Sequence, residues 1–164
     1  MAKAKAQVPF EDFLMMVDPQ YQPFVTSLSD YMVENGCSIK IEPSKSGYVV
    51  SYYHERLKRT MLNFVFRKKG LVARIYAGNI MQYMELLDTL PGSLKKSITK
   101  APVCKRKIDP TACNSRCPMG YEFILDGEPQ QKCRYNCFMF FLSDEANPAI
   151  QSIIEHEMAV VAKE

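Results

Sequence analysis

The spacing of apolar residues changes at Asn35-Gly36, and no other feature of the sequence constrains the fold as strongly. Before it, apolar side chains recur every three or four positions over residues 20–35, which predicts an amphipathic helix with a glycine cap. From Ile39 onward, apolar and polar residues alternate, which is typical of strands. A change from helical to strand period predicts helix and sheet packed in layers around one core.

Four stretches with strand character follow this change. They are residues 39–42, 48–53, 60–66 and 71–76. Short turns join them, so they predict an antiparallel meander. Beyond the meander we expect a helix from Asn79 to Pro91-Gly92, a hairpin of residues 121–125 and 132–142, and a helix beginning at Ser143 or Asn147. The predicted class is α+β: a single antiparallel sheet, made of the four-stranded meander plus the C-terminal hairpin, with helices packed on it.

The composition is that of one globular domain, which we expect to span residues 1–164. The chain is 47% hydrophobic and 24% charged, close to the averages for globular proteins. No apolar run approaches the ~18 residues of a membrane span, and no signal-peptide core follows the N-terminal lysines. We therefore expect a cytoplasmic protein without a membrane partner, in which thiols stay reduced.

A cysteine-rich segment, residues 101–137, holds five of the six cysteines. Clustered cysteines in a reducing compartment indicate a metal site or reactive thiols more often than disulfides. Six cationic side chains lie in the same segment, and they favour thiolates. These are Lys105, Arg106, Lys107, Arg116, Lys132 and Arg134.

Residues 109–118 can be interpreted as a short helix capped by Asp109 and ended by Pro118. Cys113 and Cys117 would then lie four residues apart on one helix face. We expect Cys133 at the polar start of a strand and Cys137 in the core, about 13 Å further along that strand.

Our hypothesis is a four-cysteine zinc site formed by Cys104, Cys113, Cys117 and Cys133. The spacing C-x8-C-x3-C-x15-C differs from the standard C-x2-C ribbons, so unligated thiols, a disulfide and an iron-sulfur cluster stay open as alternatives. Zinc held by four thiolates has no open position, which makes such a site structural and favours a non-enzymatic protein.

The alternative from another class is a thiol-based redox enzyme or sensor. In that hypothesis Cys113 or Cys117 attacks an electrophile and the other cysteine resolves the product. Other catalytic motifs are missing: His156-Glu157 has Val160 where a zincin needs its second histidine, and no nucleotide-binding glycine motif occurs.

The middle of the chain is basic. Residues 45–134 contain 17 Lys or Arg against 7 Asp or Glu. An anionic ligand or a nucleic acid is therefore one candidate partner. For the basic charge, the alternative is that acidic terminal helices pack beside a basic sheet. For the aromatic and cationic side chains that could bind nucleic acid, the alternative is ordinary strand and turn composition. The candidate anion-binding residues are Arg56, Arg59, Arg74, Arg116 and Arg134. A homodimer is also left open.

Two resemblances bear on this sequence. The patterns C-x3-C-P-x-G-Y-x-F from Cys113 and K-C-R-Y-x-C-F-x-F from Lys132 resemble a family of small bacterial proteins with a cysteine-rich C-terminal region and no assigned function. That resemblance spans about residues 38–142 and implies a bacterial, cytoplasmic setting. The element order over residues 20–90 is loosely similar to frataxin-type α+β sandwiches, and no iron chemistry is carried over from it.

Overall fold

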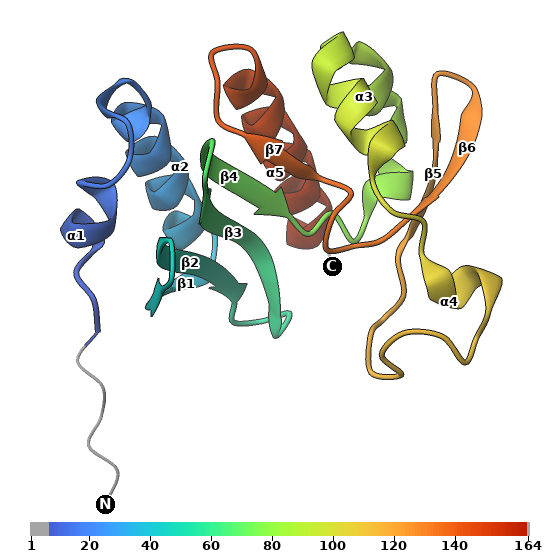
Figure 1. The fold of residues 1–164 in the computed structure, drawn as a ribbon, viewed down its shortest axis with the longest axis horizontal. Helices are drawn as coiled ribbons and strands as arrows, with labels where there is room; N and C mark the ends of the chain where they lie inside the picture. Colours follow the sequence, from blue (N-terminus) through green and yellow to red (C-terminus); the bar gives the residue numbers. More distant parts are fainter. Residues whose placement is uncertain (1–6, 164) are drawn as a thin grey trace, which may run out of the picture. The chain divides into compact units, whose positions relative to one another are not determined.

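The computed structural model describes residues 7–163, which divide into two compact units between Ala73 and Arg74. Both units contain helices and strands (Figure 1), so the predicted α+β class is confirmed. The single domain expected over residues 1–164 stays a prediction, and residues 1–6 and Glu164 lie outside the described part.

The first unit opens with helices. They are α1 (Phe10–Leu14), the 3₁₀ helix η1 (Pro19–Tyr21) and α2 (Gln22–Glu34). In α2 the buried residues Val25, Leu28 and Met32 recur every three or four positions, as the sequence predicts for this helix. Gly36 follows with φ of 96°, a left-handed conformation that glycine adopts without strain and that ends the helical path.

The predicted meander is confirmed. Its strands are β1 (Cys37–Ser44), β2 (Gly47–His54), β3 (Arg59–Arg67) and β4 (Gly70–Ile75). β1 pairs with β2 and β2 with β3, both antiparallel. In the first unit the rings of Phe13 and Tyr52 pack on fully buried Phe64, each with its centroid 5.9 Å away.

The larger sheet has the strand order β1-β2-β3-β4-β7. Its fifth strand, β7 (Met139–Phe141), joins at the part of β4 that belongs to the second unit, where the Ile75 N–H donates to the Phe138 carbonyl at 2.8 Å. The predicted C-terminal hairpin is not part of this sheet. It forms a separate two-stranded sheet of β5 (Tyr121–Leu125) and β6 (Glu128–Lys132).

The register of that hairpin corrects the sequence prediction. Asp126 and Gly127, with φ of 50° and 81°, make a two-residue turn, so the second strand begins at Glu128 and ends at Lys132, the residue at which the sequence predicts its beginning. Residues 133–138 form turns, not strand.

Two helix predictions around Pro91 are also wrong. The expected helix from Asn79 is a pair of 3₁₀ helices, η2 (Ile80–Gln82) and η3 (Met84–Thr89). The Pro91-Gly92 pair begins a helix and does not end one: α3 (Gly92–Lys100) buries Leu94 and Ile98 one turn apart. An extended proline in the N-cap position withholds only an N–H that a helix start leaves unpaired in any case.

The C-terminal helix α5 (Ala146–Ala162) is confirmed. The Ala146 N–H donates to Ser143 Oγ at 2.9 Å, and the Ser143 N–H donates to Asn147 Oδ1 at 3.1 Å, so both predicted start residues take part in a reciprocal cap. Among residues 7–163, no helix has the length and apolarity that crossing a membrane requires.

Candidate metal centre in the cysteine-rich segment

The segment begins with α4 (Lys105–Ile108), a single turn of helix directly after Cys104. The helix expected over residues 109–118 is wrong, because this stretch consists of turns. Asp109 accepts from both the N–H and the hydroxyl of Thr111, and Cys113 has a left-handed φ of 62°. Local side-chain bonds of this kind compete with helix formation, so Cys113 and Cys117 do not share a helix face.

An antiparallel bridge between Val103 and Lys132 brings Cys104 near Cys133. On either side of this bridge the backbone N–H groups of Cys104 and Cys133 donate to the opposite strand, at 3.3 and 2.8 Å. The two cysteines are therefore diagonal neighbours, and alternation of side chains puts them on one face. We call this pair the bridged half of the site.

Cys113 and Cys117 belong to a loop of turns, residues 109–119, which we call the cysteine loop. Cys113 is exposed, whereas Cys117 and Cys133 are half-buried and Cys104 is buried. The four predicted zinc ligands thus come from two structures, one paired by backbone bonds and one made of turns.

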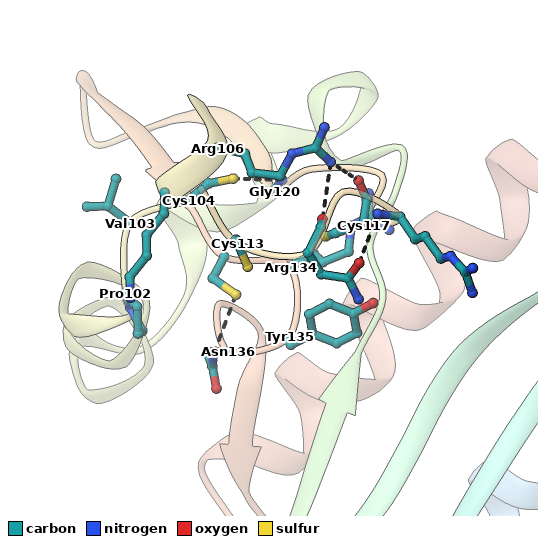
Figure 2. A pocket seen from close by; sticks show the side chains of 14 residues that line it. Pro102, Val103, Cys104, Arg106, Cys113, Cys117, Gly120, Arg134, Tyr135 and Asn136 are labelled. Atoms are coloured by element: carbon teal, nitrogen blue, oxygen red, sulfur yellow. Dashed lines mark hydrogen bonds between the residues drawn. The ribbon is translucent and has the colours of Figure 1, made fainter. Parts of the chain in front are cut away.

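All four predicted ligands line one pocket of about 520 Å³ (Figure 2). Within residues 7–163, however, no three His, Cys, Asp or Glu side chains are close enough together to hold one metal ion. The four thiols surround a shared space and do not meet at a point, so zinc binding stays a prediction.

The Cys104 sulfur is the thiol with the most defined surroundings. The Gly120 N–H donates to its Sγ at 3.2 Å, as Figure 2 shows. Burial by itself would raise the pKa of the Cys104 thiol, but backbone N–H groups of Gly120, Lys107 and Arg106 and the charge of Lys107 outweigh it and lower the pKa. Cys104 is thus a buried sulfur whose pKa is lowered by the N–H groups directed at it and by Lys107.

Gly120 is needed because the chain here lies against Lys132 and Cys104. A Cβ at this position would collide with the Lys132 carbonyl oxygen and lie 2.8 Å from the Cys104 Cβ. The absence of a side chain lets the Gly120 N–H reach the sulfur.

Arg106 connects the bridged half to the cysteine loop. Its Nη1 donates to the carbonyl oxygens of Asn114, at 3.5 Å, and of Cys117. Sequence reasoning counted Arg106 only as a nearby positive charge, and its position two residues after Cys104 was the one available signal.

Arg134 makes a second connection. Its Nε donates to the Met119 carbonyl at 2.5 Å, and its guanidinium lies over the Tyr121 ring, 5.2 Å from the centroid. This residue was predicted to bind an anion. The contacts described for it are with the protein's own carbonyl and ring.

Of the remaining thiols, Cys133 lines the pocket and Cys37 and Cys137 do not. Asn136 Nδ2 donates to Cys133 Sγ at 3.5 Å. Burial raises the pKa of Cys37 to about 11 and raises that of Cys137 further, which makes both poor thiolates. Cys37 and Cys137 are both buried, and the expectation that Cys137 lies in the core is confirmed.

The other candidate anion-binding arginines are scattered. Arg56 lies in the exposed turn before β3, and Arg59 is the first residue of that strand, so both belong to the first unit. In the second unit, Arg74 Nη2 contacts Met139 Sδ at 3.9 Å, and exposed Arg116 lines the pocket. An anion-binding surface stays a prediction.

One buried charged side chain was not anticipated. Glu157 on α5 is 1% exposed and accepts from the Asn79 N–H, Asn79 Nδ2 and the Tyr83 hydroxyl at 2.9, 2.7 and 2.7 Å. These bonds tie α5 to the 3₁₀ segment, which gives Glu157 an architectural role.

Comparison of the chain with protein-family models, with curated proteins and with solved structures finds no match. The resemblances to the bacterial cysteine-rich family and to frataxin-type sandwiches therefore stay expectations. Function has to be argued from the pocket itself.

Proposed function

We propose that this chain is a non-enzymatic protein whose cysteine-rich segment binds one structural zinc ion through Cys104, Cys113, Cys117 and Cys133. One observation carries the proposal: four cysteines spread over 30 positions all line the same pocket, while the two remaining cysteines lie outside it. Convergence of four thiols on one pocket is what a zinc ligand set requires.

Zinc binding requires closure of the cysteine loop. In a tetrahedral site each sulfur lies ~2.3 Å from the ion, so Cys113 and Cys117 have to approach the bridged half. The energy of forming the metal bonds would then stabilise a loop that lacks strands and long helices of its own. Closure by four protein ligands leaves no position for substrate, which is why the proposed site is structural.

The electrostatics of the pocket support thiolate ligands. A zinc ion with four thiolates carries a net charge of −2, and Lys105, Arg106, Arg116 and Arg134 line the same pocket. Backbone N–H bonds to the Cys104 sulfur add to this effect, as outer-shell hydrogen bonds commonly do at metal sites.

A cytoplasmic setting belongs to this proposal, because reduced thiols are needed to bind the ion, and the resemblance to the bacterial cysteine-rich family adds a bacterial source. The basic residues of the middle segment would remain for an anionic ligand or partner, and a homodimer is compatible with the proposal.

Elemental analysis of untagged protein tests it. We expect about one equivalent of zinc in the wild type and in Cys37→Ala, a matched control outside the pocket, and loss of metal in Cys104→Ser and Cys113→Ser. Less than about half an equivalent of metal in the wild type would contradict the proposal. Stoichiometric iron with sulfide would indicate an iron-sulfur cluster on the same cysteines.

Alkylation distinguishes the redox alternative. Zinc-bound thiolates should resist iodoacetamide until a chelator is added, whereas a catalytic Cys113 or Cys117 would react rapidly without one. Rapid labelling of either residue in freshly purified protein would favour the thiol enzyme or sensor.

A further inference from the structure

Two arginines join the halves of the cysteine site, and each lies just after a cysteine of the bridged half. Arg106 is two residues after Cys104, and Arg134 directly follows Cys133. The Arg106 guanidinium extends to the cysteine loop, as Figure 2 shows, and Arg134 Nε donates to the Met119 carbonyl in the same loop. Each cysteine of the bridged half is thus followed, within two residues, by an arginine that contacts the cysteine loop.

The atoms that these arginines hold lie on both sides of a predicted ligand. Arg106 binds the carbonyl of Cys117 itself and that of Asn114, and Arg134 binds the carbonyl of Met119. Bonds to the carbonyl of Cys117 and to a carbonyl two positions later hold the backbone of this part of the cysteine loop, while rotation of the side chain can still bring the Cys117 sulfur closer to the bridged half. The two connections therefore restrict where Cys117 can lie relative to Cys104 and Cys133.

Guanidinium chemistry suits this task. Arginine offers five donors in a rigid, permanently charged plane, and it binds carbonyl oxygens while stacking on a ring, as Arg134 does on Tyr121. A lysine would keep the charge, but it has neither the flat donor array nor the stacking surface.

We propose that Arg106 and Arg134 are positioning residues for metal binding, which hold the cysteine loop by its carbonyls so that Cys117 can complete the site. This inference rests on the proposed zinc function. It assigns these arginines to the protein's own loop, whereas the sequence suggested an external anion for Arg134. Their charges would also offset the net charge of −2 of a zinc tetrathiolate.

The effect should appear in metal affinity. Removing an outer-shell partner of a metal site typically weakens metal binding about 10–100-fold. We expect losses in this range for Arg106→Met and Arg134→Met, each of which removes the charge and the donors together. Arg134→Lys keeps the charge but loses the planar set of donors and the contact with the Tyr121 ring. Its metal affinity should lie between those of Arg134→Met and the wild type.

Arg116→Met provides the matched comparison. Arg116 lines the same pocket, but its side chain has no described contact with a loop carbonyl, so this change removes one charge without a connection. We expect a smaller loss of affinity than in Arg106→Met. A loss as large as that of Arg106→Met would show that charge alone matters, and it would overturn the positioning role.

The experiment is a Co²⁺ titration of the metal-free full-length chain, followed by Zn²⁺ competition, with circular dichroism of each variant to establish folding. Positioning predicts weaker binding, altered tetrahedral Co²⁺ absorption bands and metal release at higher pH in the Met variants. Wild-type affinity and spectra in folded Arg106→Met and Arg134→Met would overturn the inference while leaving the zinc site intact. Failure of the wild type to bind either metal would overturn the proposed function and this inference with it.

Discussion

The meander of the first unit and the cysteine-rich segment of the second differ in how their backbone polar groups are paired and in what stabilises them. In the meander, backbone N–H and carbonyl groups pair in strand ladders, and buried apolar rings such as Phe64 fill the core. In the cysteine loop, the described backbone bonds run largely to side chains, among them Asp109, Arg106 and Arg134. The difference teaches that the meander is stabilised by pattern and burial, whereas the loop depends on individual side chains and, in our proposal, on a metal.

Metal removal should produce the largest difference between the two regions, because it should destabilise the cysteine loop and leave the meander unchanged. Structural zinc contributes about 10–16 kcal/mol to the folding of small zinc domains, and only the cysteine loop should lose that contribution. Trypsin has sites in the segment at Lys105, Arg106, Lys107 and Arg116. We expect rapid cleavage there after chelation.

The turn between β3 and β4, which consists of Lys68 and Lys69, provides the internal control for that digestion. Cleavage at this turn should be the same with and without chelator. Equal cleavage of the cysteine-rich segment with and without chelator would contradict the proposal that bound metal stabilises the cysteine loop.

Phe64→Ala tests the opposite region. Phe64 is fully buried against Phe13 and Tyr52, so truncation should lower the free energy of unfolding by about 3–5 kcal/mol. Urea denaturation measures the loss, and hydrogen exchange should locate it in β2 and β3. Zinc content should not change, and a parallel fall in bound zinc would show that the two regions are not independent.

The contrast between these regions also explains what the sequence could predict. The meander and α5 follow from local apolar spacing, and Gly36 ends the helix as its residue type suggests. Glu157 could have been found in the same way, since it lies four residues after Ile153 and four before Val161 on the apolar stripe of α5.

The cysteine site could be predicted only in part. The four ligand candidates follow from composition, but the bridge between Val103 and Lys132 joins residues 29 positions apart, and local patterns do not encode such a pairing. The helix expected at Asp109 failed because the same side chain that can cap a helix also stabilises a tight turn. The strand expected through Cys133 failed because the hairpin turn lies earlier in the chain.

Gly120→Ala should weaken zinc binding at the cysteine site without affecting the meander. An added Cβ would displace the chain from the Lys132 carbonyl and break the N–H bond to the Cys104 sulfur. We expect zinc affinity to fall about tenfold, equivalent to about 1.4 kcal/mol, in a competition assay with a chromophoric chelator. Gly92→Ala is the control, because nothing lies within 4 Å of its Cβ position. Equal affinities in the two variants would argue against a role for this sulfur bond.

The smallest expected effect is a pH dependence of the free energy of unfolding that arises from His54 in the first unit. Burial, followed by the charges of Arg56 and Arg59, lowers the pKa of His54, whose Nδ1 accepts from the Leu57 N–H at 3.2 Å. The unfolded chain, with a histidine pKa of about 6.5, then binds a proton more readily than the folded chain. The free energy of unfolding should therefore be level above about pH 6.5 and fall below it.

Urea denaturation between pH 5 and 8 measures this slope in the wild type and in His54→Gln, which cannot titrate. We expect the slope to be reduced in the variant. An unchanged slope would assign the acid sensitivity to other groups.

The central claim is that one zinc ion is bound by sulfur from four cysteines, and X-ray absorption at the zinc edge of the purified wild-type protein tests it most directly. The account predicts a single shell of four sulfur atoms at ~2.3 Å from zinc. A shell of nitrogen and oxygen ligands, or zinc below stoichiometric amounts, would contradict it.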